Sequence, residues 1–151
     1  MAIKGAGFIS NKLLNSNMTL DVAYTLYLIL ASTPEIPKDQ IKRFVQKWFV
    51  LSTLTSRYTA SPESQMHRDM QSIEERGFLN FFAEIEASAL SESFWRVTLP
   101  QNLETYSVNS PGFRVFLAAQ VYCHSDSLFM NGMEVRDLLL IVFITSSHGL
   151  I

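Results

Sequence analysis

The chain has 151 residues, of which 48% are hydrophobic, and a formal net charge of −2, which together fit one globular domain and exclude a disordered chain. Its longest apolar stretches, residues 22–31 and 138–144, are shorter than the roughly 20 residues of a membrane-spanning helix, and no signal peptide pattern opens the chain. The single cysteine, Cys123, cannot form an internal disulfide, so we expect a cytoplasmic protein that does not associate with membranes.

The first predicted helix covers residues 20–31 and follows Asn17 and Thr19, which can cap its first turn. Its residues are apolar on nearly every side, a pattern that is typical of a helix buried all round. A loop with two prolines comes next, and the second of them, Pro37, suits the first turn of another helix.

The second predicted helix runs from Pro37 to about Ser56 and is amphipathic. Apolar residues recur at the i, i+3, i+4 and i+7 spacing of one helical face, at Ile41, Phe44, Val45 and Trp48. Lysine, arginine and glutamine residues occupy the opposite side of this helix.

Two further helices are predicted on either side of Gly77, because glycine commonly follows the last residue of a helix. Ser61 is expected to cap the first of them, with Pro62 at its first position. In the second, Phe78, Phe81 and Phe82 are expected to face inward.

The pattern weakens over residues 91–110, and residues 94–99 fit either a helix end or a short extended piece. Ser110 and Pro111 then predict the start of a helix that ends near Tyr122. The apolar run over residues 138–145 is compatible with a buried strand or with a short core helix. The predicted fold is therefore all-α, an irregular bundle of five to six helices with a short strand as an option near the C-terminus. We expect residues 1–151 to form a single domain, with residues 1–16 as a candidate flexible lead-in.

Charge is distributed unevenly along the chain. Residues 1–57 carry seven lysines and arginines against three acids, a net of +4, whereas the remainder carries a net of −6. Such asymmetry can indicate an end that faces a polyanion or a partner. A solvated helix face is the favoured interpretation, because seven cations over 57 residues make no dense patch.

No complete catalytic constellation is visible. Gly5 and Gly7 lack the preceding strand and the Gly-Lys-Ser/Thr sequence of a phosphate-binding loop. The three histidines are far apart in sequence, which argues against a metal site. Cys123 and His124 are adjacent, whereas catalytic pairs usually come from distant positions. We therefore expect no cofactor, no metal and no independent enzyme, although catalytic residues distant in sequence leave a small enzyme as an alternative.

Residues 47–64, KWFVLSTLTSRYTASPES, followed by Asp69, form the most distinctive stretch of the chain. They resemble the helical region of GmrSD-type proteins, a bacterial family of modification-dependent (type IV) restriction enzymes. The residues that match the family pattern are Trp48, Arg57, Tyr58, Ser61, Glu63 and Asp69. Residues 109–113 resemble a second landmark, and the similarity extends over residues 17–148, although only residues 47–69 are specific.

The chain departs from the family pattern at both ends. It lacks the Asp-Gly-Gln-Gln-Arg type motif of the N-terminal ParB-like domain. His148 either occupies the position of the first histidine of the HNH-like nuclease motif or is a C-terminal residue without a role. The other nuclease residues are missing, and one histidine cannot assemble a metal nuclease site.

The resemblance implies a non-catalytic helical domain or fragment that links nucleotide-sensing and nuclease parts of a restriction protein. Its partners would be DNA or the remaining domains, with Lys42, Arg43, Lys47 and Arg57 as candidate contacts to DNA phosphates. Arg57 and Tyr58 could instead fix the turn after the long helix. The alternative is a stand-alone interaction module that forms homo-oligomers through an exposed apolar patch, at Phe94 and Trp95 or at residues 138–143.

Overall fold

The computed structural model describes residues 3–14, 16–104, 107, 109–128, 130 and 132–147. Over this part of the chain it contains seven α-helices, no strand, and one isolated bridge between Asp126 and Glu134. The helices are α1 (Asn17–Ala31), α2 (Lys38–Leu54), α3 (Pro62–Arg76), α4 (Phe78–Ala89), α5 (Leu99–Glu104), α6 (Pro111–Tyr122) and α7 (Val135–Ser147). Two short 3-10 helices, η1 (Ile3–Ala6) and η2 (Asn11–Leu13), precede α1, and a π-helical turn, η3 (Phe94–Thr98), leads into α5. The prediction of an all-α fold is confirmed, with one helix more than the expected upper count.

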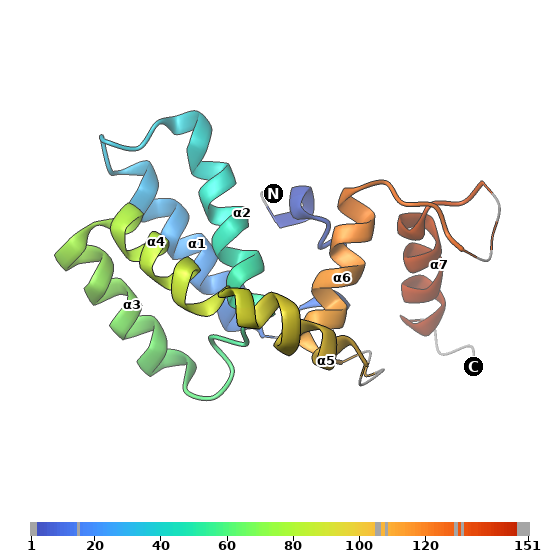
Figure 1. Cartoon of the computed structure of the whole chain (residues 1–151). Helices are drawn as coiled ribbons and strands as arrows, with labels where there is room; N and C mark the ends of the chain where they lie inside the picture. Colours follow the sequence, from blue (N-terminus) through green and yellow to red (C-terminus); the bar gives the residue numbers. More distant parts are fainter. Residues whose placement is uncertain are drawn as a thin grey trace.

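Helix α2 lies at the centre of the fold. It packs against α1, α6 and η1, and Figure 1 shows α3 and α4 to one side of it and α6 and α7 to the other. The predicted amphipathic pattern of α2 is present, because Ile41, Val45 and Trp48 are buried whereas Lys42 and Lys47 are exposed.

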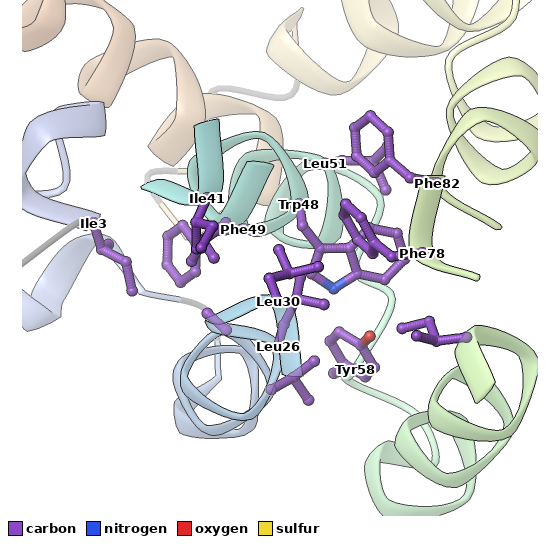
Figure 2. Close-up of a cluster of buried hydrophobic side chains, with 14 of the residues drawn as sticks. Ile3, Leu26, Leu30, Ile41, Trp48, Phe49, Leu51, Tyr58, Phe78 and Phe82 are labelled. Carbon is purple, nitrogen blue, oxygen red and sulfur yellow. The ribbon is translucent and has the colours of Figure 1, made fainter. Parts of the chain in front are cut away.

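Aromatic side chains of α2 and α4 form the middle of the core (Figure 2). The ring centroid of Trp48 lies 5.3 Å from that of Phe81 and 6.1 Å from that of Phe82. On the other side of α2, Phe49 meets Phe8 edge to face at 4.9 Å. Each buried aromatic contributes roughly 1.5–3 kcal/mol through removal of apolar surface from water. The inward orientation predicted for the aromatic row of α4 is thus confirmed.

The composition of α1 predicted a helix that is buried all round, and this prediction is wrong. One face packs on α2 through Val22, Leu26 and Leu30, but Tyr24 and Leu28 on the other face are 65% and 48% exposed. Helix α2 is the main packing partner of α1 among the described elements (Figure 1), and Tyr27 is also exposed, at 46%. Tyrosine tolerates this position because its hydroxyl group remains hydrated.

Residues 138–145 are helical and lie within α7, so the strand considered for this run is absent. A strand needs neighbouring strands to pair its backbone groups, and the described part of the chain provides none, so the backbone forms its hydrogen bonds within a helix. The middle of the run is not buried either: Leu140, Ile141 and Val142 are 36%, 50% and 45% exposed. Helix α7 packs mainly against α6 at the edge of the molecule.

The described N-terminal residues, part of the segment considered as a flexible lead-in, contribute Ile3, Phe8 and Leu13 to the core. The approach of this segment to α6 is very close at Gly7. A Cβ atom at Gly7 would lie 1.8 Å from the backbone oxygen of Ala118, and the φ angle of 89° is one that side chains rarely adopt. Glycine is therefore required here for η1 to dock between α2 and α6.

Several helix ends follow the predicted chemistry. Ser110 Oγ accepts a hydrogen bond of 3.2 Å from the backbone N–H of Phe113 at the start of α6. Gly77 separates α3 from α4 with a φ of 77°. Two caps differ from the prediction, because Ser16 caps α1 and Ser61 makes no side-chain bond at the start of α3. None of the helices in the described residues has the length and apolar character needed to cross a membrane.

Candidate functional site

The residues of the distinctive stretch meet at the carboxylate of Asp69, on α3. Arg57 donates two hydrogen bonds to this carboxylate, from Nε to Oδ2 at 2.8 Å and from Nη2 to Oδ1 at 2.6 Å. The hydroxyl group of Tyr58 donates to Oδ2 at 2.6 Å, and Nε2 of Gln65 donates to Oδ1 at 2.8 Å. Asp69 is only 1% exposed, so its charge is compensated by these four bonds rather than by water.

The same arginine also joins this cluster to the aromatic core. The Arg57 Cζ atom lies 5.4 Å from the ring centroid of Trp48 and 5.9 Å from that of Phe81, as in a cation–π contact. The turn before it is sharp, because Ser56 has a φ of 54° and the N–H of Arg57 bonds to the carbonyl of Ser52 at 3.0 Å. A left-handed residue outside glycine is uncommon, and here it directs Arg57 and Tyr58 back toward α3.

Burial and charge set the ionisation of this cluster. Burial raises the pKa of the Tyr58 hydroxyl above its usual value, and the adjacent negative charge of Asp69 raises it further. Burial by itself would lower the pKa of Arg57, but the hydrogen bond and the charge of Asp69 outweigh it, so the pKa of Arg57 is raised. Arg57 therefore stays charged and Tyr58 stays protonated near neutral pH, so both keep donating their hydrogen bonds to Asp69.

Two other residues of the family pattern lie outside the cluster. Ser61 precedes α3 and Glu63 is in its first turn, and both side chains are exposed. Glu63 is favourably placed for the helix dipole, which explains an acid at this position without a ligand. The pattern thus divides into a buried set, Trp48, Arg57, Tyr58 and Asp69, and a helix-start set.

The four cations that the sequence suggested for DNA contact do not form one patch. Lys42, Arg43 and Lys47 are exposed on α2, whereas Arg57 is directed into the cluster with Asp69. Lys42 borders a groove between α1 and α2 that Tyr24 and Tyr27 also line. Arg43 and Lys47 border a different cleft, between α2, α4 and α6. At most three of the four cations, those on α2, therefore remain candidate contacts to DNA phosphates.

The remaining sequence candidates can be placed only in part. His124 is exposed and its Nδ1 lies 3.2 Å from Glu134 Oε2, in a surface pair. Among the described residues no group of three or more His, Cys, Asp or Glu side chains could hold a metal ion. His148, the candidate remnant of a nuclease motif, lies outside the described residues.

Two features of the site were not foreseen from sequence. Gln65 is the fourth donor to Asp69, and its i, i+4 spacing on α3 is the signal that could have identified it. The cleft bordered by Arg43 and Lys47 has no such signal, because its walls come from segments far apart in the chain.

Comparison of the chain with models of protein families, with curated proteins and with solved structures finds no match to any of them.

Proposed function

We propose that this chain is a non-catalytic helical domain of a GmrSD-like restriction protein, in which it joins nucleotide-sensing and nuclease parts. The observation that carries the proposal is the convergence of Trp48, Arg57, Tyr58 and Asp69 in one cluster. Residues that are separated along the family pattern are in contact in space. In this proposal the order of these residues in the family pattern reflects one role, which is to fix α3 to the turn that follows α2.

A joining role also needs a surface for a neighbouring domain, and α7 offers one. Leu140, Ile141 and Val142 of this helix expose between 36% and 50% of their surface, and their exposed side chains are called the α7 face. Exposed apolar patches of this kind commonly mark interaction sites. In the proposed function this face contacts an adjacent domain of the restriction protein.

The size of the native polypeptide tests this proposal. An immunoblot of the source cells with an antibody against this chain should detect a band several times larger than 17.2 kDa. A single band near 17.2 kDa would contradict the joining role and would favour the second candidate.

The second candidate is a stand-alone helical module that docks on a separate protein and self-associates when that protein is absent. It rests on the same face of α7. Of the other apolar pair considered from the sequence, Phe94 is buried and Trp95, on η3, is 49% exposed. Light scattering of the purified chain at increasing concentration measures its self-association.

For this candidate, Ile141→Ser should reduce self-association strongly, because it removes apolar surface at the centre of the α7 face. The matched control is Leu79→Ser on α4, since Leu79 is 49% exposed and Ile141 is 50% exposed. A monomeric wild-type chain, or an equal effect of both substitutions, would rule out α7 as the self-association surface.

Contact with the DNA backbone is a further part of the first proposal, and its residues are Lys42, Arg43 and Lys47. The logarithm of the association constant for DNA falls linearly with the logarithm of the salt concentration. We predict that Lys42→Gln combined with Lys47→Gln makes this line less steep by about two units of slope, because each lysine that contacts a phosphate releases about one counterion. Fluorescence anisotropy with labelled duplex DNA at several salt concentrations measures the slope. An unchanged slope would remove these lysines from the DNA contact, and Lys12→Gln combined with Arg96→Gln controls for net charge.

A further inference from the structure

The cleft between α2, α4, η3 and α6 has a volume of about 420 Å³. This lies within the range of small-molecule sites, which are mostly apolar with a few polar groups. Its apolar walls come from several separate elements, among them Val50 and Leu54 of α2, Phe82 of α4, Trp95 of η3 and Val115 of α6. A cleft assembled in this way is held open by the packing of the whole bundle.

Charged and apolar residues occupy successive turns of α2 along this cleft. Arg43 and Lys47 are four residues apart and therefore on one face of the helix, and Leu51 and Leu54 follow one and two turns later. The cleft is thus cationic toward the start of α2 and apolar toward its end. Such a gradient complements a molecule with an acidic group and an apolar body.

The charges that border the cleft leave an excess of one positive charge. Glu86 of α4 also lines it, yet neither Arg43 nor Lys47 forms an ion pair with Glu86 or with any other described acid. The ammonium group of Lys47 lies 5.9 Å from the ring centroid of Phe82, above the apolar wall. Two cations over a low-dielectric wall attract an anion more strongly than the same cations in open solvent.

Two exposed aromatic side chains border the same cleft. Trp95 is 49% exposed and Tyr122 is 65% exposed, although both are large rings that usually bury most of their surface. Trp95 provides a flat surface on which an apolar ligand body can pack.

We propose that this cleft is a binding site for a small amphiphilic anion, whose acidic group contacts Arg43 and Lys47 and whose apolar body packs on Phe82 and Trp95. The inference is independent of the restriction-protein proposal, because it rests only on the walls and charges of the cleft.

The test uses two fluorescent probes that share one apolar body, the anion 8-anilinonaphthalene-1-sulfonate and its neutral counterpart N-phenyl-1-naphthylamine. Arg43→Gln combined with Lys47→Gln should weaken binding of the sulfonate about fivefold, as expected for two partly solvated ion pairs, and leave binding of the neutral probe unchanged. Glu86→Gln should strengthen sulfonate binding, because it removes the opposing charge.

A second variant tests the place of binding. Ala119 is exposed on α6 and lines the cleft, so Ala119→Phe should fill the cleft and abolish binding of both probes. Circular dichroism confirms that each variant is folded, and the charge variants alone decide the question if Ala119→Phe does not fold. Equal loss of both probes in the charge variant, or sulfonate binding that persists in Ala119→Phe and disappears in Ile141→Ser, would overturn the proposal and place the probe on α7.

Discussion

At the scale of single residues, Asp69 organises the most distinctive part of the chain. One carboxylate accepts four hydrogen bonds from three side chains, two of which come from the turn after α2. Buried ion pairs add little net stability when intact, but removal of one partner leaves an uncompensated charge. The cluster therefore fixes α3 to the turn that follows α2, and its loss is costly.

We predict that Asp69→Ala lowers the free energy of unfolding by about 3 kcal/mol, because Arg57 and Tyr58 lose their common acceptor. Urea denaturation followed by circular dichroism measures the change. Glu63→Gln is the control, since Glu63 lies on the same helix as Asp69 but is exposed, and its effect should be several times smaller. Equal effects of the two substitutions would contradict the structural role of Asp69.

Alkaline pH tests the ionisation state of Tyr58. The pKa of Tyr58 in the folded chain lies above the 10.0 of an exposed tyrosine, so above about pH 10 the unfolded chain loses this proton first. The contribution of Tyr58 to stability is therefore complete below pH 10. Above it, stability falls by up to about 1.4 kcal/mol per pH unit.

Tyr58→Phe should be less stable at neutral pH by about 1–2 kcal/mol but should show a shallower alkaline loss. Urea denaturation at intervals from pH 7 to pH 11 measures both. The remaining tyrosines are common to the two proteins and cancel in the comparison, so parallel pH profiles would show that the folded state does not hold the Tyr58 proton.

At the scale of elements, the sequence predicts where helices form, but it predicts poorly which other elements pack against them. The 3.6-residue period of α2 and the aromatic row of α4 identify their buried faces directly, because one side of each helix is polar. Helices α1 and α7 are apolar on most sides, so periodicity could not show which face packs, and both expose apolar residues. Exposure of such a helix depends on whether another element covers it, which no local pattern encodes.

The docking of η1 on α6 is an element-scale contact that a single methyl group should disrupt. We predict that Gly7→Ala lowers stability by about 2–4 kcal/mol, because the new Cβ both strains the backbone and meets the carbonyl of Ala118. It should also accelerate amide exchange over residues 3–14, which hydrogen–deuterium exchange measures.

The variant Gly77→Ala separates the effect of backbone strain from the effect of the clash with Ala118. Gly77 has a φ of 77°, but a Cβ atom added there would meet no neighbouring atom within 4 Å, so only backbone strain should result. Exchange over residues 3–14 should then remain at the wild-type rate. Faster exchange there in both variants would indicate a general loss of stability instead of the release of η1.

At the scale of the whole molecule, the two candidate surfaces lie on different parts of the bundle. The fold class and the buried motif could be anticipated from residues close in sequence, such as Arg57 and Asp69. The cleft could not, because it depends on the packing of α4, η3 and α6 against α2. The same reason explains why Arg57 does not join the lysines as a candidate DNA contact. Arg57 is close to Lys47 in sequence, but the fold turns its side chain toward Asp69 on α3.

Contacts between segments that are far apart in the sequence also constrain how the protein can fold during synthesis. The Arg114 guanidinium donates to the carbonyl of Leu14, 100 residues away, and Lys12 Nζ donates to the carbonyl of Phe143 at 3.3 Å, 131 residues away. Residues 12 and 14 therefore complete these contacts only after residues 114 and 143 have been synthesised. Until α6 emerges, Phe8 and Leu13 lack much of their burial site, so the nascent chain presents apolar side chains that chaperones can recognise.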